Sequence, residues 1–332
     1  MINRFVFQGT IYGEKSMLLS LVVPCYNEEE NVEPLYRSIK GAFQSLQMDY
    51  EIICVNDGSK DRTIQELREL HRQDPEHVAV IGFSRNFGKE AAVLAGLKRS
   101  KGDYVAIIDA DLQQKPELVV QMLDILEKSD EYDCVAAYQE NRQEGRFIRF
   151  CKSNGYKLMN KVCETEFYTG ASDFRVMRRI MVDAILSMPE YYRFSKGIFS
   201  WVGFPTYYMP YTAEKRHAGE SKWGFKKLLK YGMEGFFSFS TFPLKIASYI
   251  GSVTSVMAIV YLIIVVIQKL AFSIDIPGYP TIIVLILFLG GVQLLIMGII
   301  GEYLARAYIQ GKNRPIYIER EYYETENECR RE

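Results

Sequence analysis

The sequence YVAIIDADLQ, residues 104–113, decides the fold class that we predict for this chain. Its apolar half, residues 104–108, ends directly in two aspartates, Asp109 and Asp111. A short apolar run that ends in a polar turn is typical of a strand buried on both faces. Two carboxylates one residue apart can share a divalent cation, since Mg²⁺ and Mn²⁺ prefer oxygen ligands. Alone, the pair can equally cap the helix that Pro116 opens, so the rest of the chain must decide.

The same alternation of strand and helix precedes this segment. We expect strands at residues 18–24, 51–55 and 78–83, and helices at residues 32–46, 64–70 and 86–98. This pattern predicts an α/β fold with a mainly parallel sheet covered on both faces. In such sheets ligands bind beyond the carboxyl ends of the strands, where this chain has the polar segments 25–31 (CYNEEEN) and 56–59 (NDGS). We therefore expect Glu28 and Asp57 to share one sheet edge with Asp109.

Two long apolar runs follow the α/β part. Residues 246–267 and 281–301 hold 22 and 21 residues without a charge. At about 1.5 Å per residue, each spans about 30 Å, the thickness of a bilayer core. The alternative, a buried hairpin of a soluble protein, would overfill a small core. Residues 215–245 carry seven Lys and Arg, whereas the loop at 268–280 carries one Lys. The positive-inside rule therefore predicts a multi-pass protein of the inner (plasma) membrane with both termini cytoplasmic.

Between the two parts, aromatic residues mix with lysines, as in a helix that lies in the membrane interface. An ordinary amphipathic helix packed on the α/β domain is the alternative. We expect five units: an N-terminal extension (1–16), a catalytic domain (17–222), juxtamembrane amphipathic helices (223–245), a two-helix transmembrane anchor (246–304) and a cytoplasmic tail (305–332).

The composition excludes several classes. A net charge of -1 gives no support to nucleic-acid binding, which normally requires a strongly basic domain. The six cysteines show neither a CxxC pair nor metal-ligand spacing, which indicates reduced thiols. The N-terminus has no cationic stretch followed by an apolar core, so we expect no signal peptide.

Several segments together resemble the family-2 glycosyltransferases, which have the Rossmann-like GT-A fold. The segments are VPCYNE at 23–28, VNDGSKD at 55–61, and DADLQ at 109–113 with Pro116 and Glu117. Two later segments, SDFR at 172–175 and RHAGESKW at 216–223, resemble one branch of this family. That branch includes dolichol-phosphate mannose synthases and bacterial undecaprenyl-phosphate glycosyltransferases. The two-span anchor is similar to that of the bacterial members.

The resemblance implies a site that binds a nucleotide sugar. Pro24, Tyr26 and Glu28 would hold the base and ribose, and Asp57 would accept a hydrogen bond from a base N–H. Asp109 and Asp111 would hold Mg²⁺ or Mn²⁺ and the diphosphate, with Ala110 and Gln113 lining the turn. Arg216 and Lys222 would reach the donor diphosphate or the acceptor phosphate, the alternative being contact with lipid headgroups alone.

Asp173 and Arg175 are further catalytic candidates that the resemblance implies. The branch often uses the aspartate as a general base, yet a phosphate monoester has a second pKa near 6 and needs little deprotonation. Asp173 would then position the sugar hydroxyls or stabilise charge at the anomeric carbon. Arg175 would orient Asp173 or pair with phosphate. Many relatives carry an arginine where this chain has Gln139, and Arg142 is the best substitute.

The resemblance implies an inverting transferase that moves a sugar from a nucleoside diphosphate to a polyisoprenyl (undecaprenyl) phosphate at the cytoplasmic membrane face. UDP-glucose or UDP-N-acetylhexosamine is favoured over GDP-mannose. One alternative is a processive polysaccharide synthase, but the chain lacks the Q-x-x-R-W motif and has only two spans. Another is a non-catalytic nucleotide-sugar-binding scaffold, which would not need metal ligands.

Two kinds of protein partner are expected. Two spans do not easily carry the lipid-linked product across a membrane, so a separate flippase is implied. A homo-oligomer is open, because Gly290, Gly291, Gly298 and Gly301 would let helices approach closely.

Overall fold

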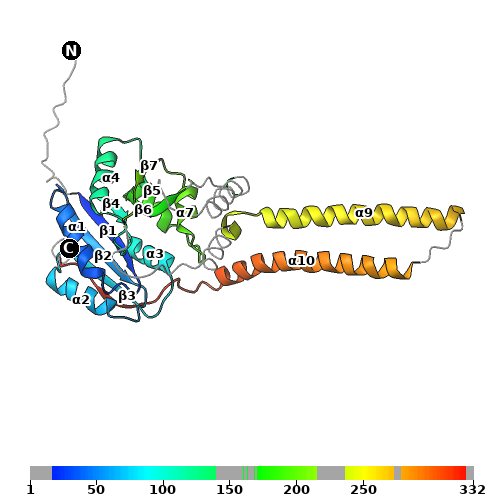
Figure 1. The fold of residues 1–332 in the computed structure, drawn as a ribbon, viewed down its shortest axis with the longest axis horizontal. Coiled ribbons are helices and arrows are strands. Elements are labelled where there is room, and N and C mark those ends of the chain that lie inside the picture. Colours follow the sequence, from blue (N-terminus) through cyan, green and yellow to red (C-terminus); the bar gives the residue numbers. More distant parts are fainter. Residues whose placement is uncertain are drawn as a thin grey trace, which may run out of the picture.

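The computed structural model describes residues 17–139, 170–214, 236–272 and 278–326, with single positions at 160, 163 and 168. An α/β domain lies at one end of the molecule, and two long helices project from it (Figure 1). The expected N-terminal extension and most of the juxtamembrane segment lie outside the described residues.

The domain is built on one sheet, which has eight strands in the described part of the chain, in the order β7-β5-β6-β4-β1-β2-β3-β8. The strands are β1 (Leu18–Cys25), β2 (Asp49–Asn56), β3 (Val78–Phe83), β4 (Tyr104–Ile107), β5 (Cys134–Gln139), β6 (Ala171–Arg178), β7 (Thr206–Tyr211) and β8 (Glu319–Tyr323). Strands β1 to β4 are parallel to one another, whereas β6 runs antiparallel to both β4 and β5. The predicted mainly parallel GT-A sheet is confirmed, and the carboxyl ends of β1, β2 and β4 meet at one edge.

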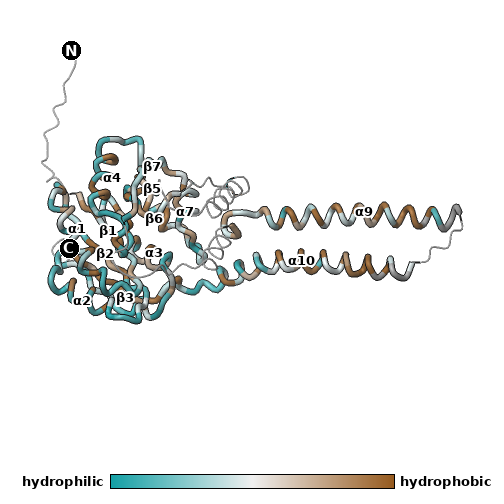
Figure 2. The backbone as a smooth tube through the Cα atoms, in the orientation of Figure 1, coloured by the Kyte–Doolittle hydropathy of each residue, from teal (hydrophilic) through white to brown (hydrophobic). Residues whose placement is uncertain are grey.

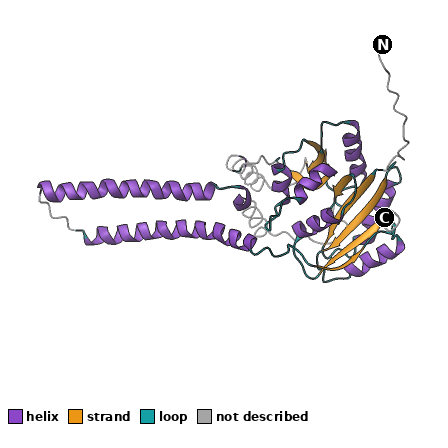
Figure 3. Cartoon of the chain, turned by 180° about the vertical axis from the view of Figure 1, so that it is seen from behind, coloured by secondary structure: helices purple, strands orange, loops and turns teal. Residues whose placement is uncertain are grey.

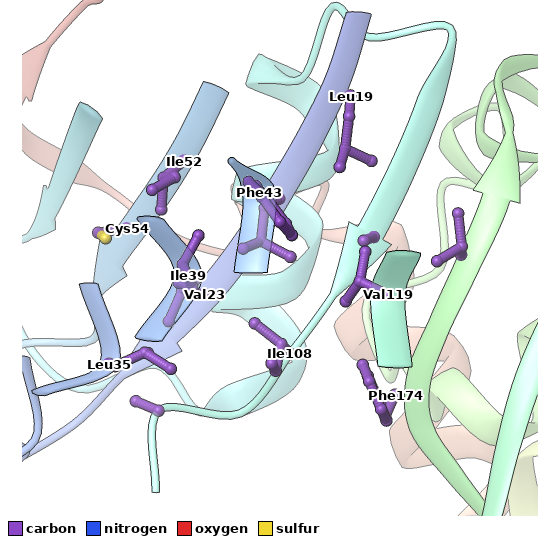
Figure 4. Packing of buried hydrophobic residues seen from close by; sticks show 14 of the residues in the cluster. Leu19, Val23, Leu35, Ile39, Phe43, Ile52, Cys54, Ile108, Val119 and Phe174 are labelled. Carbon is purple, nitrogen blue, oxygen red and sulfur yellow. The ribbon is translucent and has the colours of Figure 1, made fainter. Parts of the chain in front are cut away.

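Helices cover both faces of this sheet. They are α1 (Val32–Phe43), α2 (Thr63–Gln73), α3 (Lys89–Arg99), α4 (Glu117–Lys128), α6 (Arg179–Leu186) and α7 (Ser195–Trp201). Figure 4 shows Leu35, Ile39 and Phe43 of α1 packed on Val23 and Ile52 of the strands. Residues of α2 and α4 join this cluster, while α3, α6 and α7 pack on the opposite face. Alternate strand residues thus enter cores on opposite faces, which explains the near-continuous apolar runs.

The two projecting helices are α9 (Phe242–Phe272) and α10 (Tyr279–Gly311), of 31 and 33 residues. They carry apolar residues along most of their length (Figure 2). The two helices lie side by side (Figure 3). At about 1.5 Å per residue they are about 46 and 50 Å long, which exceeds a bilayer core of about 30 Å. Both are long and apolar enough to cross a membrane, and their large apolar side chains are exposed. The helices are longer than the predicted spans because helical structure continues beyond the uncharged runs.

The base of this hairpin is fixed to the α/β domain. The Tyr303 hydroxyl donates a hydrogen bond of 2.6 Å to the Ser240 carbonyl, just before α9. The Gln310 amide donates to the carbonyl of Pro189 at 2.9 Å and accepts the N–H of Tyr191 at 2.8 Å. The C-terminal end of α10 is therefore attached to the loop that follows α6.

The chain after α10 returns to the sheet of the α/β domain. Strand β8 pairs antiparallel with β3 at the sheet edge, where the sequence suggested only a tail. Arg68 donates hydrogen bonds of 2.9, 2.8 and 2.5 Å to the two carboxylate oxygens of Glu321. The centres of the stacked Tyr317 and Phe83 rings are 4.9 Å apart. Both ends of the hairpin therefore lie on the same side as the α/β domain.

Candidate active site

The turn after β4 is held by its own side chains. The backbone N–H of Asp109 donates to Gln114 Oε1 at 2.9 Å, and Gln114 Nε2 donates to Asp109 Oδ2 at 3.3 Å. Asp111 Oδ1 accepts the N–H of Gln113 at 3.2 Å, while Ala110 is buried. Gln114 is only 5% exposed, so it positions Asp109 from below the surface. Sequence reasoning missed Gln114, since a second glutamine in DLQQ carries no sign of burial.

Asp173 lies beside this turn because of the sheet register. Ile107 of β4 faces Arg175 of antiparallel β6. Continuing the register by two residues brings Asp109 opposite Asp173. The structure therefore brings together two predicted acidic groups, Asp109 and Asp173, that are far apart in the sequence.

Lys89 joins the two aspartates. Its Nζ lies 2.6 Å from Asp109 Oδ1 and 3.0 Å from Asp173 Oδ2. Sequence reasoning missed Lys89, because it placed this residue inside a helix that began at Asn86. Helix α3 instead begins at Lys89, directly after Gly88 with φ of 102°. A lysine at a helix start, where the backbone favours negative charge, is the signal that could have indicated a special role.

The charges in this cluster stabilise one another. Burial alone would lower the pKa of Lys89, but the attraction of Asp109 and Asp173 raises it overall. Burial alone would raise the pKa of Asp173, yet Lys89, Lys196 and Arg175 hold it well below its usual range. Asp173 is therefore a carboxylate, and its Oδ1 is buried without a hydrogen-bond partner among the described residues.

Arg175 acts from inside the protein. It is 4% exposed, and its guanidinium carbon lies 3.7 Å from the centre of the Phe199 ring. Its Nη2 donates to the Ser172 carbonyl at 2.9 Å, and its Nε donates to the Asp173 carbonyl at 3.4 Å. The sequence left open whether Arg175 orients Asp173 or pairs with phosphate. Its contacts with the carbonyls of Ser172 and Asp173 favour the first role.

Asp57 fixes the loop that precedes α3. Its carboxylate is 3% exposed and accepts hydrogen bonds from Phe87 N at 2.7 Å, Asn86 Nδ2 at 2.8 Å and Gly88 N at 3.0 and 3.2 Å. These bonds hold residues 86–88 out of the helix and so set where Lys89 begins it. The contact of Asp57 with a base stays a prediction, and it would have to replace one of these four interactions.

The titration of Asp57 provides a test of this arrangement. Burial raises the pKa of Asp57 to about 6, against the opposing effect of the Phe87 and Gly88 N–H groups. A carboxyl whose pKa is higher in the folded state contributes stability below its unfolded pKa and loses it as the pH rises through the folded value. Relative to Asp57→Asn, the wild type should lose on the order of 3 kcal/mol between about pH 4 and pH 7. Thermal unfolding of both proteins across this range measures the difference, and a constant difference would contradict the assignment.

Gly58 permits this close packing. Its φ is +61°, and a Cβ there would collide with the backbone of Arg85 and Asn86. Gly58→Ala should lower stability by roughly 2–5 kcal/mol, since a left-handed alanine and an overpacked contact both cost free energy. Gly41→Ala is the matched control, because a Cβ at Gly41 in α1 meets nothing within 4 Å and should be neutral or stabilising. Equal melting temperatures for the two variants would show that the loop has no fixed position.

The loops after β1 and β2 are tied together at the same edge. Asn27, with φ of 52°, accepts the N–H of Lys60 at 2.9 Å and donates its own N–H to Ser59 Oγ at 2.9 Å. The N–H of Glu28 donates to Thr63 Oγ1 at 2.8 Å. Four predicted nucleotide-binding residues thus share the edge with the turn after β4, namely Pro24, Tyr26, Glu28 and Asp57.

Three predicted phosphate-binding residues, Arg142, Arg216 and Lys222, lie outside the described residues. Glu214 is the last described residue before Arg216 and Lys222, and it lies beside the turn that follows β4. The Glu214 N–H donates to the Gln113 carbonyl at 3.0 Å, and Gln113 Nε2 donates to the Glu214 carbonyl at 3.2 Å. The segment that carries Arg216 therefore starts next to the Asp109–Asp111 turn.

The two carboxylates of Asp109 and Asp111 fit a cation that also binds a diphosphate. Among the described residues no group of three His, Cys, Asp or Glu side chains forms a complete cation cage. Mg²⁺ usually takes one or two carboxylates and completes its shell with water and substrate phosphates. Asp109 already holds a cation in the form of the Lys89 ammonium, which shows that its carboxylate accepts a positive charge at this position.

Known proteins share both parts of this chain. Residues 20–186 match the profile of glycosyl transferase family 2, and residues 242–307 match that of the GtrB C-terminal hairpin. An uncharacterized glycosyltransferase of Synechocystis sp. is 41% identical over 90% of this chain and 94% of its own length. The putative glycosyltransferase CsbB of Bacillus subtilis is 43% identical over 92% of each chain. The bactoprenol glucosyl transferase of Shigella phage SfII is 42% identical over 91% of this chain and 97% of its own length. The chain therefore belongs to glycosyl transferase family 2 and carries the C-terminal hairpin of the GtrB type.

Proposed function

We propose that this glycosyltransferase moves a sugar, with inversion, from a nucleoside diphosphate to a polyisoprenyl phosphate at the cytoplasmic face of the inner membrane. The observation that carries the proposal is the attachment of the apolar hairpin to the catalytic domain through Pro189, Tyr191 and β8. A catalytic site held at the bilayer surface in this way suits an acceptor that is itself a membrane lipid. The name of the phage relative, a bactoprenol glucosyl transferase, points to the same acceptor class.

The reaction is an in-line displacement. A phosphate oxygen of the acceptor forms a bond to the anomeric carbon while the bond from that carbon to the donor diphosphate breaks. The electron pair leaves with the nucleoside diphosphate. A divalent cation at Asp109 and Asp111 would neutralise the charge that builds on this leaving group. Gln114 holds Asp109 in the turn where that charge develops.

Asp173 acts by position and charge in this proposal. A carboxylate whose pKa lies below its usual range is a weak base. The acceptor phosphate is largely ionised at neutral pH and has little need of a base. Asp173 would instead orient the sugar and stabilise positive charge at the anomeric carbon, with Arg175 fixing its backbone.

The membrane topology follows from the charge distribution. Arg306, Lys312 and Arg314 lie at the domain end of α10 or just beyond it, on the side that carries the catalytic sheet. The positive-inside rule assigns this side to the cytoplasm, where nucleotide sugars are available. A separate flippase would then carry the product across the membrane. We also propose that two copies of the chain associate through the glycines of α10, namely Gly290, Gly291, Gly298 and Gly301.

A donor screen tests the function. Purified protein in vesicles that contain undecaprenyl phosphate is supplied in turn with UDP-glucose, UDP-N-acetylhexosamines and GDP-mannose. We expect one lipid-linked monosaccharide, with UDP-glucose the best donor. A ladder of long products would indicate the processive alternative, and donor binding without turnover would indicate the scaffold. Either result would overturn the proposal.

A further inference from the structure

Lys89 places a positive charge between two carboxylates and at the start of a helix. Its ammonium contacts Asp109 of the turn and Asp173 of β6, two carboxylates that would repel each other without a cation between them. The residue also opens α3, and a helix start disfavours positive charge. The local backbone therefore does not account for a lysine here, whereas the two carboxylates do.

The position of Lys89 is set by the rest of the site. Asp57 holds Phe87 and Gly88 in an extended loop, and α3 begins with the next residue. Gln114 holds Asp109 through its backbone N–H and Oδ2, whereas Lys89 contacts Oδ1. The ammonium is thus placed by several contacts on separate elements, and its side chain is still 36% exposed, so ligands can reach it.

We propose that Lys89 is the resident counter-cation of the metal-free site and gives up Asp109 when the donor's divalent cation binds. This inference rests on the proposed function for its donor. The ammonium has three N–H donors, of which the structure uses one on Asp109 and one on Asp173. Once Asp109 binds the cation, Lys89 stays on Asp173, and the N–H group that Asp109 had accepted is released between the turn and β6. The incoming lipid phosphate must reach this place, and its oxygens can accept a hydrogen bond from the released N–H group.

Competition between the ammonium and the metal ion is the measurable consequence. The test uses the full-length protein in detergent and MnCl₂ alone, without nucleotide or lipid, and follows thermal unfolding at increasing Mn²⁺. Lys89→Met should melt several degrees below wild type in chelator, because two carboxylates lose their shared cation. Mn²⁺ should raise its melting temperature more than that of wild type, with an apparent affinity about tenfold higher. Lys128→Met, which removes an exposed lysine from a pair with Asp124 on α4, is the matched control and should behave as wild type.

An equal response of wild type and Lys89→Met to Mn²⁺ would overturn the inference. If Lys89→Met does not fold, the double variant Lys89→Met/Asp173→Asn removes one charge of each sign and is compared with Asp173→Asn alone. Tighter Mn²⁺ binding by the double variant supports the inference, and equal binding refutes it. Since no sugar is transferred in these experiments, failure of the donor screen would leave their outcome interpretable by itself.

Discussion

Asp111→Asn should lower the rate of lipid-linked sugar formation by about a thousandfold or more, with the protein still folded. The second carboxylate of the turn supplies charge to the cation that stabilises the leaving diphosphate, and electrostatic stabilisation of this kind is usually the largest catalytic effect. Asparagine keeps the oxygen that accepts the Gln113 N–H, so the turn should hold its shape. Transfer of labelled glucose to undecaprenyl phosphate gives the rate, and thermal unfolding checks the fold.

Asp124→Asn is the control for this prediction. Asp124 lies on α4 in an exposed ion pair with Lys128, and exposed pairs contribute little free energy. It should retain wild-type activity. Full activity in Asp111→Asn would remove this aspartate from the metal site.

Asp173→Asn should reduce kcat by about a hundredfold to ten-thousandfold, while the acid side of the pH profile stays in place. The neighbouring cations hold the pKa of Asp173 low, so this carboxylate is charged throughout the range of the assay. Its contribution to stability is present above the unfolded pKa and is lost only at strongly acid pH. The fall of activity below about pH 6 should then belong to the acceptor phosphate.

The pH dependence of kcat for wild type and Asp173→Asn distinguishes the two roles of this residue. A phosphonate acceptor, whose second pKa is higher, should move the acid limb upward in both proteins. This second measurement also separates the acceptor from Asp57, whose titration would not depend on the acceptor. Loss of the acid limb in Asp173→Asn alone would show that Asp173 is the base after all.

The catalytic sheet was largely predictable because its strands are buried on both faces. Apolar runs mark such strands in the sequence, and the predicted run at 78–83 coincides with β3. The turn after β4 was likewise predictable, since two aspartates directly after a buried strand can lie only at its carboxyl end. The family resemblance added Asp173, and the antiparallel register of β6 explains why it belongs beside Asp109.

Contacts between distant segments were not predictable. Helix α3 starts three residues later than its apolar periodicity suggests, because Asp57 captures the N–H groups of Phe87 and Gly88. Strand β8 has mostly charged and aromatic residues, and its pairing depends on partners such as Arg68, which lies more than two hundred residues earlier. The role of Lys89 depends on the late start of α3 and on contacts with distant segments, since neither of its carboxylate partners lies near it in the sequence.

The proposed reaction depends on a divalent cation at Asp109 and Asp111, and removal of this cation is the most direct test. Purified protein in vesicles with undecaprenyl phosphate and UDP-glucose is assayed before and after EDTA, and again after Mn²⁺ or Mg²⁺ is restored. We predict that the chelator stops formation of the glycolipid and that either metal restores it. Undiminished transfer in excess EDTA would contradict the central claim.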